Sequence, residues 1–396
     1  MIIRYGIKCK TCGKVYTLRI GMGYEREELF TFPCEDCGQE IQIKLILFPE
    51  KHSWKIQTVS NSEETDTEGK IINLDALCPI LSENKNSDMY FGRLAFLRNM
   101  AEQFDFSKID ASHLSDNTYP ITYKEEWEEL RKAWELEDRQ PNISQKILKN
   151  FSLYQEEPLE SVNDFIYRFL SKYLGKEWNL YYEGILKFVS NTLYKDIINS
   201  QNFLEEFTHS LFNTHKKLVL EICKNYFNNF DYFNPVHLHY RVGIKVPIDA
   251  NITSNGFNKI KKFYGDSYET LSKLILFVAY VNNLYQGRAH DTFEKLTLKK
   301  YKELDNSSKY NCFSQQVPLN YFADGLDNNI RNASHHLSIS YNDKDDTITL
   351  GTGKSGENKK NITYTEYVQN CDFIFCKIIM LFLIEIVIFD KYTRDD

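Results

Sequence analysis

Residues 9–13 read Cys-Lys-Thr-Cys-Gly, and residues 34–38 read Cys-Glu-Asp-Cys-Gly. The two Cys-x-x-Cys pairs are separated by twenty-one residues, a spacing typical of a four-cysteine zinc site. The glycine after each pair suits a tight turn with a positive φ, in which backbone N–H groups point at the sulfurs. Residues 15–20 and 41–48 have alternating or β-branched apolar side chains and predict strands beside these turns. We therefore expect a small β zinc ribbon over residues 1–50, with the ligands Cys9, Cys12, Cys34 and Cys37.

Four thiolates leave no open coordination position, so this pattern predicts one structural Zn²⁺ per chain rather than a catalytic metal. An iron site or redox-active cysteine pairs are alternatives that the same spacing allows. Residues 1–50 contain seven Lys or Arg and seven Asp or Glu, so their charge gives no reason to expect nucleic-acid binding there. A docking or sensing role suits the ribbon better.

The composition favours long helices in the rest of the chain, with 27 Phe and 26 Tyr against 17 Gly and 9 Pro in 396 residues. The net charge of −7 argues against a protein that coats nucleic acid through bulk charge. The start of the sequence lacks the apolar core of an export signal, and nine cysteines without such a signal indicate a reducing, cytoplasmic setting. Residues 373–389 are strongly apolar, but Lys377 and Glu385 interrupt them, so we expect a buried helix and no membrane contact.

The order of these patterns predicts a mainly α fold with four parts. These are the zinc ribbon over 1–50, a polar linker or connecting segment over 51–88, a helical middle domain over 89–245 and a C-terminal helical bundle over 246–396. Residues 234–255 contain two prolines and an alternating stretch, which suggest a hairpin or connector at the boundary between the two helical parts. A polar hairpin is expected between residues 347–350 and 361–364, before a last helix over 365–390.

The segment that carries most chemical information is residues 331–336, Arg-Asn-Ala-Ser-His-His. On a helix, Arg331, Asn332, His335 and His336 fall within about 140° of one another, and the apolar side chains fall on the opposite face. An imidazole can transfer protons near neutral pH, and a guanidinium can hold a phosphate on which negative charge builds up. Metal-free RNA cleavage through the ribose 2′-hydroxyl needs these groups.

This segment resembles the Arg-Asn-x-x-x-His signature of the HEPN ribonucleases, and the likeness covers roughly the last 130 residues. The resemblance implies a HEPN-type helical bundle in which Arg331, Asn332 and His336 are catalytic, whereas His335 is not part of the signature. It also implies a composite site formed by two motifs. Because the chain has one such motif, a homodimer is expected. The layout looks like that of bacterial abortive-infection proteins, which implies an endoribonuclease toxin that cleaves RNA in antiviral defence after a phage or host protein triggers it.

Two other functions fit the same sequence. A noncatalytic HEPN module could bind a protein or nucleic-acid partner, and a zinc-dependent regulator could act through the ribbon. Lysines at 259–262 and 299–302 give residues 251–336 a net positive charge, which fits either a solvated helix face or a rim that guides RNA. His237 and His239 lie two residues apart on an expected strand, but no matching ligands are near them in the sequence, so a structural role is expected.

Overall fold

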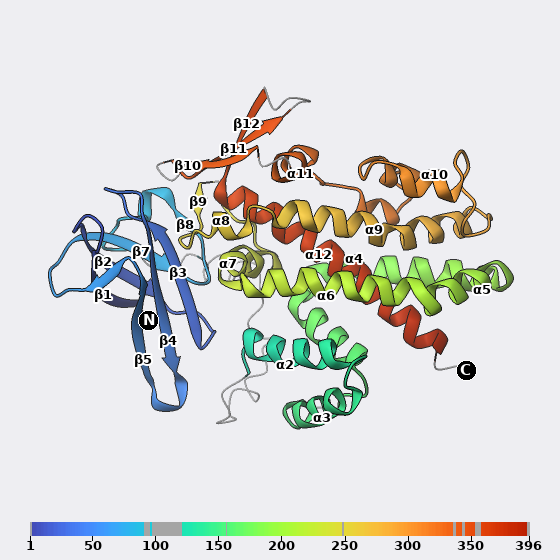
Figure 1. The fold of residues 1–396 in the computed structure, drawn as a ribbon, viewed down its shortest axis with the longest axis horizontal. Helices are drawn as coiled ribbons and strands as arrows, with labels where there is room; N and C mark the ends of the chain where they lie inside the picture. The colour runs from blue at the N-terminus through green and yellow to red at the C-terminus, as the bar shows by residue number, and fades with distance from the viewer. Residues whose placement is uncertain are drawn as a thin grey trace.

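The computed structural model describes residues 2–90, 96, 121–155, 157–247, 249–335, 338–342, 345–352 and 358–393. The prediction of a mainly α fold with only a small N-terminal β piece is wrong, because the chain is about 54% helix and 20% strand. Figure 1 shows the N-terminal strands gathered at one end of the molecule and the helices at the other. A third group of strands projects from the helical end, between α11 and α12 in the chain.

The first sheet has the strand order β6-β1-β2-β7. Strands β1 (Ile2–Cys9) and β2 (Val15–Gly21) form an antiparallel hairpin, whereas β7 (Lys70–Asp75) pairs with β2 in parallel. The short β6 (Ser62–Glu64) pairs with the other edge of β1. Burial in β1 follows the period-two pattern of a half-buried strand, whereas the last four residues of β2 are all buried.

The second sheet has the order β3-β4-β5, all antiparallel, formed by β3 (Glu27–Pro33), β4 (Glu40–Phe48) and β5 (Ser53–Ser60). Residues 51–88, expected as a linker, therefore supply β5, β6 and β7 to the two sheets, and also β8 (Ile80–Leu81). The expected ribbon is thus part of a larger β region. Its core contains residues from both sheets, including Leu18, Ile43 and Ile72.

From residue 121 onward, the described helices start with α2 (Tyr123–Leu136), which Thr122 opens with a capping box, and α3 (Pro141–Phe151). The remaining helices are α4 (Val162–Lys195), α5 (Ile197–Glu206), a π-helical turn (Phe207–Leu211), α6 (Phe212–Asn228), α7 (Phe230–Arg241), α8 (Phe257–Ile260), α9 (Phe263–Tyr285), α10 (Leu298–Glu303), α11 (Asn328–His335) and α12 (Tyr364–Thr393). Short 3₁₀ turns cover Pro49–Lys51, Ser82–Asn84, Ser152–Tyr154, Ser308–Cys312 and Leu319–Phe322.

Helix α12 is the central element of the helical region and confirms the expected last helix. Almost all of its residues up to Ile388 are buried, and it crosses the helical region diagonally in Figure 1. It packs on α4, α6, α7 and α9, so both expected helical parts share one hydrophobic core. Among the residues that the structure describes, no helix combines the length and apolar character needed to span a membrane.

Three local expectations differ from the structure. The expected strand around His237 is part of α7, which continues through Pro235 because its apolar face is buried in the common core. The sequence pattern also predicts helices over 291–304 and 320–337, but the first shortens to α10 and the second contains a 3₁₀ turn followed by α11. A further helix is predicted over 89–104 from apolar residues at three- and four-residue spacing, and most of that range lies outside the described residues.

The polar hairpin near the C-terminus is confirmed and gains a third strand, giving the order β10-β11-β12. Its strands are β10 (Ile339–Asn342), β11 (Thr347–Thr352) and β12 (Asn358–Thr363), all antiparallel. A two-stranded pairing of β8 with β9 (Ala250–Asn251) joins the β region to the helical region.

The β region is also fixed to the helices through β3. The backbone N–H of Leu29 donates to Asp231 of α7 at 3.3 Å, and that of Thr31 donates to the Ser254 hydroxyl at 3.1 Å. Lys124 of α2 forms an ion pair with Asp231 at 2.6 Å. These contacts satisfy backbone donors on the edge strand β3 and hold the two regions together.

Candidate functional site

The four predicted metal ligands come together at two matching turns. Cys9 ends β1, and Cys34 follows β3. The backbone N–H of Gly13 donates to the Cys9 carbonyl at 2.9 Å, and that of Gly38 donates to the Cys34 carbonyl at 2.7 Å. Both glycines have positive φ, 81° and 69°, as these turns require. The four sulfur atoms lie within 4.8 Å of one another, so the predicted set of four cysteines can bind one metal ion.

Hydrogen-bond donors surround the sulfurs. The Tyr16 hydroxyl accepts from the backbone N–H of Glu35 at 2.9 Å, which leaves its proton to donate to Cys34 Sγ at 3.2 Å. Asn61 Nδ2 donates to Cys9 Sγ at 3.5 Å. Its Oδ1 accepts from the backbone N–H of Thr11 at 3.1 Å, which fixes the first turn. Such donors orient metal ligands and stabilise thiolates.

The thiols titrate unequally. Burial opposes ionisation of Cys34, but hydrogen bonds from Tyr16 and from the backbone N–H groups of Cys37 and Asp36 lower its pKa to about 7. The backbone N–H of Lys14 lowers the pKa of Cys12, but desolvation and the neighbouring thiols raise it to about 12. Four close thiols cannot all ionise without a cation, so a bound metal would supply the missing positive charge.

The second predicted site lies on α11. Asp327 precedes the helix, and its Oδ1 accepts from the backbone N–H groups of Asn329 and Ile330 at 2.7 and 3.3 Å. Ile330 and Ala333 are buried, and the helix packs on α9. Arg331 and Asn332 occupy the more exposed side, so the predicted polar and apolar faces hold for these four residues.

Arg331 is engaged by its neighbours. Its Nη2 donates to Glu269 Oε1 of α9 at 2.7 Å, and its Nη1 donates to Asn332 Oδ1 at 2.9 Å. Its guanidinium carbon lies 5.9 Å from the centre of the Tyr268 ring. Its Nε has no hydrogen-bond partner within the described part of the chain. His336 lies outside the described residues, so Arg331 and Asn332 are the two predicted catalytic residues that the structure places.

Sequence reasoning missed Glu269, although it shapes the surroundings of Arg331. Asn306 donates an additional hydrogen bond to Glu269, and Lys309 lies nearby. Burial lowers the pKa of Lys309, Glu269 raises it and Lys273 lowers it further. No local sequence pattern could have identified Glu269, because it is 62 residues away from Arg331.

A third polar cluster lies wholly inside the helical core. His237 Nδ1 is 3.0 Å from Asp372 Oδ1, its Nε2 donates to the Tyr173 carbonyl at 2.8 Å, and Tyr226 donates to Asp372 at 2.5 Å. Together with His237 and Asp372, Cys376 Sγ forms a group that could hold a metal ion. His239 does not join this group and instead contacts the carbonyl of Pro235 at 2.9 Å. Full burial and nearly complete hydrogen bonding favour the structural role expected for His237.

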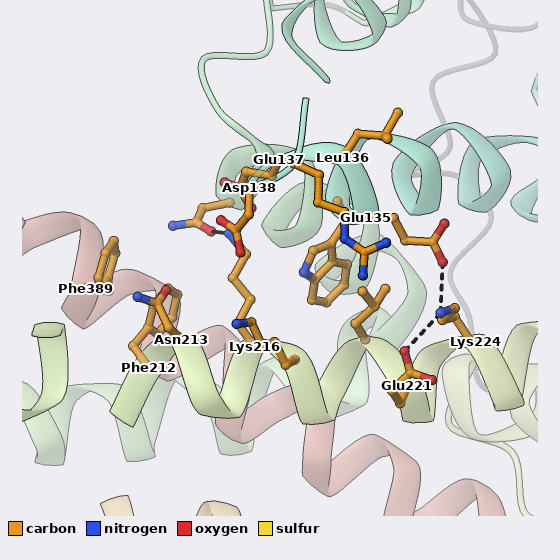
Figure 2. A pocket seen from close by; sticks show the side chains of 15 residues that line it. Glu135, Leu136, Glu137, Asp138, Phe212, Asn213, Lys216, Glu221, Lys224 and Phe389 are labelled. Carbon is orange, nitrogen blue, oxygen red and sulfur yellow. Dashed lines mark hydrogen bonds and ion pairs between the residues drawn. The ribbon is translucent and has the colours of Figure 1, made fainter. Parts of the chain in front are cut away.

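A cavity of about 790 Å³ lies between α2 and α6. Figure 2 shows two ion pairs of Lys224 on α6, one with Glu135 of α2 across the cavity and one with Glu221 of its own helix, each at 2.9 Å. Lys216 joins Glu137 across the cavity at 2.6 Å. Acidic and basic side chains balance in its described lining, which includes neither Arg331 nor Asn332. The cavity therefore shows no preference for an anion such as RNA.

No protein-family model, curated protein or solved structure matches this chain.

Proposed function

We propose that this chain is a metal-independent endoribonuclease of the HEPN type that acts as a homodimer in abortive-infection antiphage defence. The observation that carries the proposal is the position of Arg331. Its guanidinium lies on the outer face of α11 beside Asn332, and His336 follows within the same motif.

The proposed RNA cleavage assigns one role to each of three residues. His336 would take the proton of the ribose 2′-hydroxyl or protonate the leaving 5′-oxygen, since an imidazole exchanges protons near neutral pH. Arg331 would hold the scissile phosphate and stabilise the charge that develops on it. Asn332 would orient these groups, and its contact with Arg331 at 2.9 Å supports that role.

One motif supplies only half of the composite site that the HEPN resemblance implies. A second copy of the chain would therefore supply the other Arg331 and His336. The basic side chains of α10, Lys299, Lys300 and Lys302, are exposed and could guide RNA toward this site.

We also propose that the ion at the four cysteines is Zn²⁺ and that its role is structural. The donor set fits zinc, because four thiolates at mutual ligand distances match a closed tetrahedral site. A bound Zn²⁺ would fix the two turns. The hydrogen bonds from Tyr16 and Asn61 would stabilise the thiolates toward it.

The test is incubation of the purified wild-type protein with total cellular RNA and mapping of the cleavage ends. Products should end in a 2′,3′-cyclic phosphate, and added EDTA should leave the initial rate unchanged. His336→Ala and Arg331→Ala should each lower the rate by about 100-fold or more. His335→Ala, one position away, should retain it.

Undiminished cleavage by the His336→Ala protein would exclude the assignment. A wild-type protein that binds RNA without cutting it would instead favour the noncatalytic binding module. Loss of function in Cys34→Ser, combined with a silent Arg331→Ala, would favour a regulator that acts through the ribbon.

A further inference from the structure

A second cavity, of about 600 Å³, lies where the β region meets the C-terminal hairpin. The second cysteine turn and β7 form one wall, and Asn251 and Thr253 beside β9 form another. Tyr341 and Asp346, at the β10–β11 turn, close it. Figure 1 shows β10 next to β9 and the end of the β region, so one occupant would contact all three segments.

Asp346 brings a carboxylate oxygen without a partner to this cavity. Its Oδ1 accepts from the Tyr341 hydroxyl at 2.7 Å, but its Oδ2 is shielded from solvent and has no hydrogen-bond partner among the residues that the structure describes. A buried carboxylate oxygen without a donor is costly, and in native proteins it usually marks a missing water, ion or ligand. Burial raises the pKa of Asp346 to about 6, although the Tyr341 hydrogen bond and Lys85 lower it.

The other charges of the lining indicate the sign of the missing group. Glu35 and Asp36 are acidic, and Lys85 is the one basic residue among the described residues of the lining. Glu35 and Asp36 already have partners, Lys70 at 2.7 Å and Lys14 at 3.2 Å. The charge of Lys85 acts on Asp346, but no ion pair joins these two side chains in the described part of the chain. Cys34 and Cys37 also line the cavity, and four thiolates around a divalent ion keep a net negative charge. The cavity therefore favours a cation and disfavours a phosphate.

The geometry points to recognition of an arginine side chain of a partner protein by this cavity. A guanidinium is planar, carries five N–H donors and is more weakly hydrated than an ammonium group. One donor can meet Asp346 Oδ2, and others can reach neutral oxygens such as those of Asn251 and Thr253. An ammonium ion offers fewer donors in a fixed plane and loses more hydration on entry.

The position of the cavity gives such binding a consequence. The β10 strand begins four residues after α11 ends. An occupant that holds the β10–β11 turn against the second cysteine turn would therefore also restrain the chain that follows Arg331. In the proposed function, the partner that carries the arginine would be the protein that triggers RNA cleavage, and this part of the inference rests on that proposed function. The binding of an arginine side chain in the cavity does not depend on it.

The experiment measures binding of N-acetyl-L-argininamide to the full-length, metal-loaded protein by ligand-observed NMR. N-acetyl-L-citrullinamide, which has the same shape without the charge, is the control ligand. Asp346→Asn is the test variant, because asparagine tolerates the positive φ of 54° at this position. Asp345→Asn removes the same charge from the exposed neighbouring residue and is the control variant.

We expect the argininamide to bind the wild type and Asp345→Asn alike, at least tenfold more weakly to Asp346→Asn, and more tightly than the citrullinamide. In the wild type, the backbone amide resonances of Gly38, Asn251 and Tyr341 should shift on titration, a measurement that needs no variant. Equal binding by Asp346→Asn, equal binding of citrullinamide, or no shift at these three amides would each overturn the inference. Because the readout contains no RNA, failure here is distinguishable from failure of the proposed nuclease.

Discussion

The guanidinium of Arg331 donates to the carboxylate of Glu269 at 2.7 Å, so the cation proposed to hold the scissile phosphate is already paired within its own chain. Both side chains are about 30% exposed, which places the pair within reach of solvent. A phosphate must compete with Glu269 for the same donors. The ion pair with Glu269 therefore limits how much Arg331 can contribute to the affinity for RNA.

Replacing Glu269 by glutamine should strengthen RNA binding. The substitution keeps a hydrogen-bond acceptor near Arg331 but removes the competing charge. A partly exposed ion pair contributes about 1 kcal/mol or less, so RNA affinity should rise by up to about fivefold. Fluorescence anisotropy with a single-stranded RNA would measure this, and Glu183→Gln, exposed on α4, is the matched control. A fall in affinity would mean that Glu269 positions Arg331 rather than competing for it.

Removing the Tyr16 hydroxyl should weaken metal binding without abolishing it. Tyr16→Phe keeps all four sulfurs but removes the donor 3.2 Å from Cys34 Sγ. Loss of such an outer hydrogen bond typically lowers metal affinity by about 10- to 100-fold. Competition with a chromogenic chelator gives the affinity, and Tyr24→Phe, at an exposed position, should leave it unchanged. Unaltered affinity in Tyr16→Phe would show that the hydroxyl only packs beside the sulfur.

Lys377 should make stability depend on pH. It is fully buried on α12, donates to the Tyr321 carbonyl and lies over the Tyr321 and Phe373 rings, 4.0 and 4.5 Å from their centres. Burial lowers its pKa from 10.5 to about 7, although Asp324 raises it. Between these two values the unfolded chain binds more protons, so this group makes the free energy of unfolding rise with pH across that window. The rise should be on the order of a few kcal/mol.

The matching variant is Lys377→Met, which fills a similar volume without a charge. It should remove this rise and stabilise the protein at pH 7 by about 1–3 kcal/mol. Urea denaturation at pH 7, 8 and 9 measures both effects. An unchanged pH slope in Lys377→Met would assign the pH dependence to other groups.

Truncating Asp372 should destabilise the core strongly. Asp372→Ala leaves His237 and Tyr226 without the carboxylate that lies 3.0 and 2.5 Å from them. Breaking a buried, hydrogen-bonded pair of this kind costs about 3–5 kcal/mol. Chemical denaturation measures the loss, and Glu366→Ala, exposed on the same helix, should stay within about 0.5 kcal/mol of the wild type. A small loss at Asp372 would show that water or a rearranged His237 replaces the carboxylate.

Local patterns were enough to predict that the four cysteines form one group that could hold a metal ion, and to predict the last helix and the amphipathic character of α11. The four cysteines carry their spacing and their turn glycines within a few residues of each sulfur. Helix α12 has so many apolar residues that its burial follows from composition alone. In each case, the interactions that determine the structure lie close together in the chain.

Features that depend on distant partners were not predictable in this way. Strand β7 pairs in parallel with β2 across a polar stretch that reads as a linker, so its partner is distant in the sequence. Strand β5 exposes most of its side chains and therefore shows no clear apolar face. Residues 237–241 have a strand-like alternation that packing into the common core overrides. Glu269 and Tyr16 were missed because their roles arise only when separate elements meet.

The pairing of β8 with β9 has a consequence for synthesis on the ribosome. Ile80 faces Asn251 and Leu81 faces Ala250, so the intervening helices leave from and return to the same point. The backbone N–H of Ser82 also donates to the Asp249 carbonyl at 3.1 Å. A nascent chain can assemble the cysteine turns early, but this edge of the β region stays open until residue 251 has left the exit tunnel. Closure of this edge therefore requires that the helices between β8 and β9 have been translated, which couples maturation of the β region to synthesis of the middle of the chain.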